Sequence, residues 1–239
     1  MRNLKIGGYS MFFYDATYLL VLIGAVLSMW ASARVNSTYK KYARVLSRSG
    51  LTGAEAARRI LQLAGIYDVR VEHIGGNLTD HYDPRGKVLR LSDSVYGSSS
   101  VAAVGVAAHE CGHAIQDAKA YAPLRFRGAF VPVANLGTKA ALPIILLGLV
   151  FGSSYTLIQV GLLCFACGTL FQLVTLPVEF NASARAIDIL GNTHMLSEEE
   201  LSHTRKVLSA AAMTYVAAAA ASVLSLLRLI LLFGGRSRD

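Results

Sequence analysis

Two histidines four residues apart, with a glutamate directly after the first, are the residues of this chain best suited to chemistry: His109, Glu110 and His113. Positions i and i+4 of an α-helix lie on one face, so both imidazoles can bind the same metal ion. A carboxylate beside that ion can act as a general base. The combination predicts a catalytic Zn²⁺ site of the kind used by zinc hydrolases.

The motif requires a helix, and the residues around it predict one from about Ser100 to Ala118. Residues 101–108 contain no proline, and the serines before them can cap the first turn. Cys111 lies two residues after His109, about 200° around such a helix. We therefore expect Cys111 to point away from the metal as a small buried residue.

Segments without charged residues predict four membrane-spanning helices. The chain has 239 residues, of which 54% are hydrophobic and only 16% charged, too apolar a composition for an ordinary soluble enzyme. A crossing of about 30 Å takes about 20 apolar residues. Residues 16–33 suit one crossing, and residues 140–178 suit two, with a break at 152–154. Residues 207–227 are also free of charge, and the last crossing extends to residue 233 because the long side chain of Arg228 can reach toward an interface.

Between these segments the sequence predicts a short helix and a small sheet. Thr52 and Glu55 suit a capping box at the start of the helix. Residues 69–73 alternate as a strand does, and residues 78–91 suit a hairpin with its turn at 83–86. An edge strand there would either hold an extended peptide by β-augmentation or serve only as scaffold, and the sequence leaves both open.

The expected fold is an α+β membrane protein, with four transmembrane helices and a zincin-like catalytic domain that combines the metal-binding helix with the small sheet. The expected segments are transmembrane helix 1 (16–33), the zincin-like catalytic region (34–139), a transmembrane hairpin of helices 2 and 3 (140–178), a third-ligand helix with its connection (179–206) and transmembrane helix 4 (207–233).

The distribution of Lys and Arg predicts the orientation in the membrane. Four crossings place residues 34–139 and 179–206 on one side, which carries 18 of the 23 Lys and Arg residues. The positive-inside rule makes that catalytic side cytoplasmic. The net charge is +8, and no nucleic-acid-binding motif accompanies it. We therefore expect these basic residues to lie near the membrane and to attract the anionic lipids of the bilayer.

A catalytic zinc has three protein ligands and one open position, so the two histidines need a third partner. Glu179 directly follows the third predicted crossing, on the same side of the membrane as the metal-binding helix. Asp188, His194 and His203 are its rivals on that side. Spacing alone does not choose among these four residues.

Four motifs carry a family resemblance: residues 78–85, 87–92, 107–116 and 177–183 are similar, in the same order, to the YugP-type membrane zinc metallopeptidases of bacteria. The resemblance extends over nearly the whole chain. It implies a zinc endopeptidase in the bacterial cytoplasmic membrane that hydrolyses bonds of peptide or protein substrates, membrane proteins among them.

More distantly, the chain resembles the HtpX/Ste24 class of gluzincin membrane proteases. Their third zinc ligand is the Glu of a Glu-aromatic-x-Ala-Asp segment. Residues 179–183 match that segment except that Ser183 stands in place of the Asp. The resemblance therefore implies Glu179 as the third ligand and leaves the role of the missing carboxylate unfilled.

The motif and the resemblance imply the same mechanism, in which Glu110 takes a proton from a zinc-activated water and later delivers it to the leaving amine. A donor for the developing oxyanion is also needed. Tyr82, Arg185, His194 and His203 are candidates, and the sequence does not choose among them.

Two alternatives to this function remain. A site-2-type intramembrane protease would use Asp188 as third ligand, but polar residues flank the motif and leave no clean apolar span around His109. A non-catalytic membrane scaffold would keep the zinc only for structure, but a structural site has no need of a base such as Glu110. The sequence does not specify the substrate, the oligomeric state or any regulator.

Overall fold

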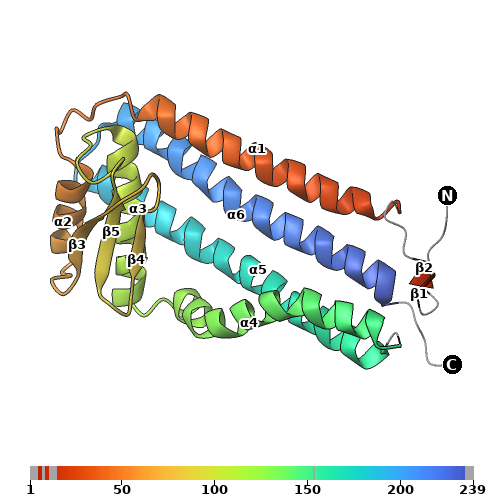
Figure 1. Ribbon diagram of the computed structural model, residues 1–239. Coiled ribbons are helices and arrows are strands. Elements are labelled where there is room, and N and C mark those ends of the chain that lie inside the picture. The colour runs from red at the N-terminus through yellow and green to blue at the C-terminus, as the bar shows by residue number, and fades with distance from the viewer. Residues whose placement is uncertain (1–4, 7–8, 11–14, 153, 235–239) are drawn as a thin grey trace. The chain divides into compact units, whose positions relative to one another are not determined.

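The computed structural model describes residues 5–6, 9–10, 15–152 and 154–234 (Figure 1). Ser153 of the predicted hairpin break and Arg2, Arg236 and Arg238 of the charge argument lie outside the described residues. The described elements are β1 (Lys5–Ile6), β2 (Tyr9–Ser10), α1 (Tyr18–Tyr42), α2 (Gly53–Leu63), β3 (Arg70–Ile74), β4 (His81–Asp83), β5 (Val88–Ser92), α3 (Val101–Ala118), α4 (Ala122–Val150), α5 (Tyr155–Asn192) and α6 (Glu198–Phe233).

The chain divides into two compact units, and four helices, α1, α4, α5 and α6, contribute residues to both. The helical unit comprises Met1–Trp30, Phe126–Thr175 and Tyr215–Asp239. The second unit comprises Ala31–Arg125 and Leu176–Thr214, and it contains the motif helix and the three-stranded sheet. We call it the sheet unit.

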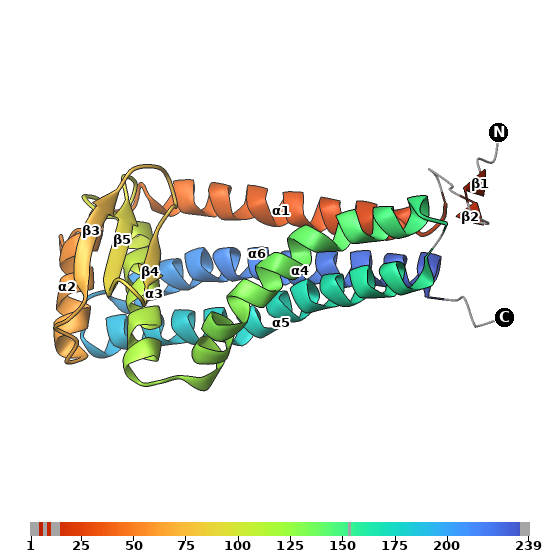
Figure 2. The same cartoon turned by 60° about the horizontal axis from the view of Figure 1, so that its bottom comes forward.

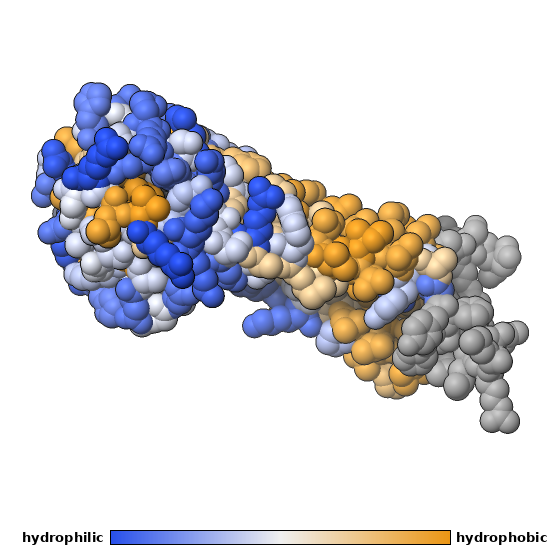
Figure 3. All heavy atoms as spheres, turned by 90° about the horizontal axis from the view of Figure 1, so that it is seen from above, coloured by the Kyte–Doolittle hydropathy of each residue, from blue (hydrophilic) through white to orange (hydrophobic). Residues whose placement is uncertain are grey.

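Four of the described helices, α1, α4, α5 and α6, are long and apolar enough to cross a membrane. Few of their residues are buried by the protein itself: 11% of the most apolar window in α1 and in α6, and 28% in α4 and in α5. Hydrophobic residues gather over a large part of the surface seen in Figure 3, as expected where lipid takes the place of water. Together with the small sheet, this confirms the predicted fold class.

These helices extend beyond the charge-free segments from which the sequence predicted them. The helix α4 begins at Ala122 rather than near residue 140, and α5 runs past residue 178 as far as Asn192. A helix continues wherever its backbone hydrogen bonds can form, whether or not lipid surrounds it. The predicted membrane boundaries, which depend on the position of the bilayer, stay predictions.

Small residues let the helices of the helical unit approach closely. A Cβ added at Gly24 of α1 would lie 3.0 Å from the Cα of Ala221 on α6. One added at Gly161 of α5 would lie 3.0 Å from the carbonyl oxygen of Ala141 on α4. Such close contacts are the usual means by which helices associate in lipid, where the hydrophobic effect gives no attraction between them.

The sheet of the sheet unit has the order β3-β5-β4, as Figure 2 shows. The central strand β5 pairs with β3 in parallel and with β4 in antiparallel fashion. Its side chains Val88, Leu89 and Leu91 are fully buried, which explains why this strand occupies the centre. The antiparallel pairing of β4 with β5 confirms the predicted hairpin. The strands β3 and β4 are the two edge strands of the sheet.

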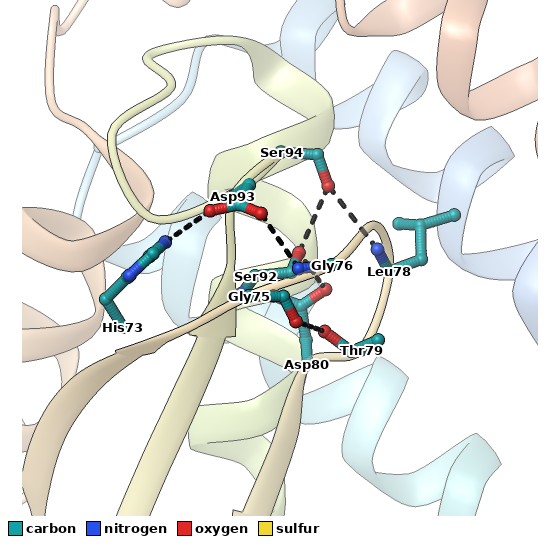
Figure 4. Close-up of polar contacts among 9 residues, drawn as sticks. All are labelled: His73, Gly75, Gly76, Leu78, Thr79, Asp80, Ser92, Asp93 and Ser94. Carbon is teal, nitrogen blue, oxygen red and sulfur yellow. Dashed lines mark hydrogen bonds and ion pairs between the residues drawn. The ribbon is translucent and has the colours of Figure 1, made fainter.

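Two aspartates fix the loop that leads from β3 into the edge strand β4 (Figure 4). The Asp80 carboxylate accepts hydrogen bonds from the Ser92 backbone N–H at 2.7 Å and from its hydroxyl at 2.9 Å. Asp93 accepts from the Gly76 N–H at 2.8 Å and lies 2.6 Å from Nε2 of His73. Burial raises the pKa of Asp80 despite these bonds. The position of β4 therefore depends on a partly buried carboxylate.

Caps predicted from sequence define both short helices of this unit. Thr52 and Glu55 form the reciprocal capping box at the start of α2. The Ser100 hydroxyl accepts from the Ala103 N–H at 3.1 Å and starts α3. Each such cap is worth about 1 kcal/mol of helix stability. The predicted helix from Ser100 to Ala118 is confirmed.

Candidate metal centre

The helices α3 and α5 bring the predicted metal ligands together. His109 and His113 lie on one face of α3, and Glu179 lies on the part of α5 that belongs to the sheet unit. The two helices touch at Gly112, where an added Cβ would lie only 2.5 Å from the carbonyl oxygen of Ala182. Any side chain at that position would push the helices apart and separate the histidines from the glutamate.

The three side chains have the spacing of ligands around one small metal ion. Oε2 of Glu179 lies 3.3 Å from Nε2 of His109 and 3.5 Å from Nε2 of His113. A tetrahedral zinc at about 2.0–2.2 Å from each donor sets neighbouring donors about 3.3–3.6 Å apart. The two histidine rings are nearly perpendicular, with centroids 4.8 Å apart. These residues therefore fit a zinc ion, and they form a His, His, Glu cluster of the size expected for a metal site.

A second contact on each imidazole selects the nitrogen that faces the cluster. Nδ1 of His109 lies 3.1 Å from the Ser183 hydroxyl, and Nδ1 of His113 lies 3.1 Å from Oε1 of Gln116. An imidazole that donates from Nδ1 leaves the lone pair of Nε2 for a metal. Both rings thus present the same nitrogen, Nε2, toward Glu179.

Gln116 extends this support across to α5. Its amide nitrogen donates to the Val178 carbonyl at 2.8 Å and to Oδ1 of Asn181 at 3.0 Å. The same oxygen of Asn181 accepts from Nε of Arg185 at 2.8 Å. Sequence reasoning missed Gln116 and Asn181. The sequence signal for Gln116 was its place one helical turn after His113. In the structure it is fully buried and must find hydrogen bonds inside the protein.

Glu110 lies in the same cluster of buried residues but makes no hydrogen bond. Glu110 is 8% exposed, and its carboxylate has no hydrogen bond or close ion pair with any other described residue. The carboxylate of Glu179, by contrast, is engaged by both histidines. A buried carboxylate without a protein partner can accept a proton from a water at the site.

The electrostatics of the site favour a cation. Burial alone would lower the pKa of His113, but the hydrogen bond that the ring donates to Glu179, supported by the nearby Glu110 carboxylate, reverses the effect and raises it. The two glutamates thus outweigh the cost of placing positive charge on a buried ring. A divalent cation would satisfy the same negative potential that otherwise attracts a proton.

The rival residues from the sequence lie elsewhere. Asp188 is exposed and is absent from the metal cluster. His203 packs against Tyr42 with ring centroids 4.8 Å apart. The hydroxyl of Tyr82 donates to Asp117 at 2.8 Å. Of the candidates for stabilising the oxyanion, Arg185 is connected to the site by a hydrogen bond. Its Nε donates to Asn181, which also accepts from the Gln116 side chain that contacts His113.

Cys111 lies on the opposite face of α3, as its spacing predicted. Its thiol is fully buried and contacts the Ala57 carbonyl of α2 at 3.6 Å. Burial raises the pKa of this thiol well above its usual range. A protonated, buried thiol is a packing residue and does not serve as a ligand.

A helix with two metal-facing histidines and an intervening glutamate, in a chain that also has a small sheet and four apolar helices, is typical of the class of membrane-bound zinc metallopeptidases. Residues 17–234 match the family described as "Putative neutral zinc metallopeptidase", and the chain belongs to that family. It is 46% identical over 224 residues to "Putative membrane protease YugP" of Bacillus subtilis (strain 168), covering 93% of this chain and 99% of that protein. No solved structure matches the chain.

The family relative and the four apolar helices both indicate an integral membrane protein. The family and the His109, His113 and Glu179 cluster both indicate that its cofactor is zinc.

Proposed function

We propose that this protein is a gluzincin-type zinc endopeptidase, with His109, His113 and Glu179 as the metal ligands and Glu110 as the general base. The observation that carries the proposal is the approach of one Glu179 oxygen to Nε2 of both histidines, at 3.3 and 3.5 Å. That oxygen comes from a second helix, as the third ligand of a gluzincin does.

A zinc ion bound there supplies a Lewis acid that polarises the scissile carbonyl and lowers the pKa of water toward about 7. Glu110 takes the proton from the attacking water and passes it to the leaving amine, a role that suits a carboxylate with no competing hydrogen bond. Ser183 and Gln116 hold the two imidazoles in the orientation that this chemistry needs. Arg185 is our candidate for stabilising the oxyanion.

We propose that the substrate binds as an extended peptide along β4. In the described part of the chain, β4 pairs only with β5, which leaves its other backbone edge without a strand. This edge strand packs near α3, since Tyr82 of β4 donates to Asp117 of that helix. Backbone hydrogen bonds at a sheet edge bind peptides with little regard to sequence.

The orientation is also a proposal: the catalytic side faces the cytoplasm, supported by the excess of Lys and Arg on that side.

The function is tested with detergent-purified protein, unfolded casein as substrate and zinc measured by elemental analysis. Glu110→Gln should keep about one zinc per chain yet lose peptidase activity by several orders of magnitude, because the base is gone. The matched control is Glu72→Gln, a change of the same type in β3. A Glu110→Gln variant as active as the wild type would refute the enzyme assignment.

A further inference from the structure

Asp117, on the last turn of α3, joins the metal-binding helix to the hairpin of β4 and β5. Its Oδ2 accepts hydrogen bonds from the Tyr82 hydroxyl and from Nζ of Lys87, each at 2.8 Å. The side chain of Asp117 is 24% exposed, so water and salt screen these contacts only in part. One carboxylate oxygen of α3 therefore receives both contacts from the hairpin.

The two donors hold the hairpin at two places. Tyr82 is the middle residue of β4, and Lys87 directly precedes β5. Figures 1 and 2 both show β4 beside α3. Because one donor lies on the edge strand and the other lies where the turn ends, Asp117 restrains both the distance and the tilt of β4 relative to α3.

The Tyr82 hydroxyl is engaged with Asp117 throughout the physiological pH range. The ring of Tyr82 is partly buried and packs against the hydrophobic core of the sheet unit. This burial, together with the hydrogen bond to Asp117, raises the pKa of Tyr82 well above its ordinary value. A tyrosine hydroxyl has one proton to donate, so the bond to Asp117 leaves none for an oxyanion.

Lys87 has a backbone conformation that glycine would adopt more easily. Its φ is 47°, in the left-handed region, where a residue with a side chain is strained. Its carbonyl oxygen accepts from the Arg70 N–H at 3.1 Å. Its ammonium group pairs with Asp117, and this hydrogen bond raises the pKa of Lys87. The lysine side chain thus supplies a contact with α3 that a glycine would lack.

The same turn of α3 also supports the metal ligands. His113 lies four residues before Asp117, on the same face of the helix. Gln116, the residue before Asp117, contacts Nδ1 of His113 at 3.1 Å and donates to the Val178 carbonyl of α5 at 2.8 Å. Adjacent residues of this turn therefore hold the metal ligands and the hairpin. A hairpin that moves away from Asp117 also moves relative to His113.

We propose that Asp117 is a positioning residue, which sets the distance between a peptide bound along β4 and the metal ligands of α3. This inference rests on the proposed function, in which β4 binds the substrate. Backbone hydrogen bonds to β4 hold the peptide but do not fix how far its scissile bond lies from α3. A misplacement of about 1 Å can lower a rate about 100-fold. The contact with Asp117 therefore acts on the chemical step more than on binding.

The strand β4 keeps its place in the sheet without Asp117. Its pairing with β5 places Tyr82 opposite Leu89. At the start of the strand, Asp80 accepts from the Ser92 N–H at 2.7 Å. Neither interaction involves α3. Removing the Asp117 carboxylate should therefore loosen the hairpin from α3 while the substrate-binding edge stays intact.

The test measures the steady-state kinetics of casein cleavage by the full-length, zinc-loaded protein in detergent. Asp117→Ala removes both contacts and should lower kcat roughly 10- to 100-fold, with less than about a 3-fold change in KM. It should still bind about one zinc per chain, because the contacts of His113 with Gln116 and Glu179 are unchanged.

Asp68→Ala is the matched control for Asp117→Ala. Asp68 also pairs with Lys87, at 3.8 Å, but it precedes β3 and makes no link to α3. Its side chain is 66% exposed. A surface ion pair of this kind contributes little to stability. Asp68→Ala should therefore keep the wild-type kcat and KM.

Tyr82→Phe removes one hydroxyl and keeps the packed ring, so it should fold even if Asp117→Ala does not. It should lower kcat about 3- to 10-fold, the equivalent of one hydrogen bond. Tyr67→Phe, at a tyrosine that is 81% exposed, is its control. The double variant Tyr82→Phe with Asp117→Ala should be no slower than Asp117→Ala, because residues that act through one contact are not additive.

Three results would overturn the positioning role. Wild-type kcat in both Asp117→Ala and Tyr82→Phe, with a lower unfolding temperature, would mean that the contact is only structural. A higher KM with unchanged kcat would mean that Asp117 supports binding and not spacing. Losses that multiply in the double variant would mean that Tyr82 acts on the substrate directly.

Failure of the proposed function gives a different pattern. In that case the zinc-loaded wild type would not cleave casein, or Glu110→Gln would be as active as the wild type, and the inference would fall with the function. A low kcat with normal KM and zinc in Asp117→Ala and Tyr82→Phe, next to an inactive Glu110→Gln and a fully active Asp68→Ala, supports the positioning role.

Discussion

Nδ1 of His109 and the hydroxyl of Ser183 lie 3.1 Å apart, so a serine occupies the place from which the related protease segment would supply a carboxylate. The sequence did not show what takes over from the missing carboxylate. In the structure the neutral hydroxyl oxygen of Ser183 makes the contact with His109. A neutral partner orients the imidazole but does not add negative charge to it. We therefore expect the Ser183 contact to fix the orientation of the His109 ring without strengthening its bond to a metal as a carboxylate partner would.

Substitutions of Ser183 test this relationship. Ser183→Ala removes the partner and should lower zinc affinity, within the 10- to 100-fold typical of residues that support a ligand. Ser183→Asp supplies a charged partner and should restore or exceed the wild-type affinity. Competition with a zinc chelator of known affinity measures both. Equal affinity in Ser183→Ala and the wild type would mean that the contact does not orient His109.

Glu179→Gln should strip both zinc and activity, because it removes a direct ligand and costs more than about 100-fold in affinity. Asp188 supplies the control, since it lies nine residues farther along α5, exposed and outside the cluster. Asp188→Asn should keep the metal. Zinc content measured after gel filtration distinguishes them. The opposite pattern would favour the site-2-type alternative and exclude the gluzincin assignment.

Local signals in the sequence were enough to predict the metal-binding helix. The spacing of His109 and His113, the cap at Ser100 and the capping box at Thr52 each depend on residues within a few positions of one another. Such local patterns determine helices almost independently of the rest of the chain. The position of Glu179 after the third predicted crossing made it one of four candidates for the third ligand, and the family resemblance selected it.

Contacts between distant segments were not predictable in the same way. The parallel pairing of β3 with β5 joins strands separated by β4, and no local pattern encodes it. The roles of Gln116 and Asn181 follow from the close approach of α3 and α5 at Gly112. The start of α4 at Ala122 was hidden because Arg125 and Arg127 interrupt its apolar pattern.

Asp80→Ala should destabilise the sheet unit by about 1–3 kcal/mol, because the fully buried Ser92 would lose its hydrogen-bond acceptors. Thermal or denaturant unfolding measures the loss. Asp93→Ala acts as a comparison: its carboxylate is more exposed, so its removal should cost less. If β4 binds the substrate, Asp80→Ala should also raise KM more than it lowers kcat. A larger loss from Asp93→Ala would contradict the assigned importance of Asp80.

Zinc binding should strengthen as the pH rises through neutrality. In the metal-free site the hydrogen bond to Glu179 raises the pKa of His113 above its usual value, so the ring keeps its proton to a higher pH than an ordinary histidine does. Zinc must displace that proton, so zinc binding is weaker at the lower pH values at which the ring is protonated. The competition ends once the ring is neutral. Chelator competition between pH 5.5 and 8.5 measures the profile. A flat profile would mean that His113 is not a ligand.

The catalytic side is predicted to face the cytoplasm, and single cysteines can locate it. In a variant without the three native cysteines, Arg85→Cys marks the exposed turn between β4 and β5, and Ser154→Cys marks the connection before α5. A membrane-impermeant maleimide applied to intact cells should label Ser154→Cys and spare Arg85→Cys, because the excess of Lys and Arg keeps the sheet unit inside. Inverted vesicles should give the opposite pattern. Labelling of Arg85→Cys in intact cells would reverse the orientation, while His109 and Glu179 would still share one side.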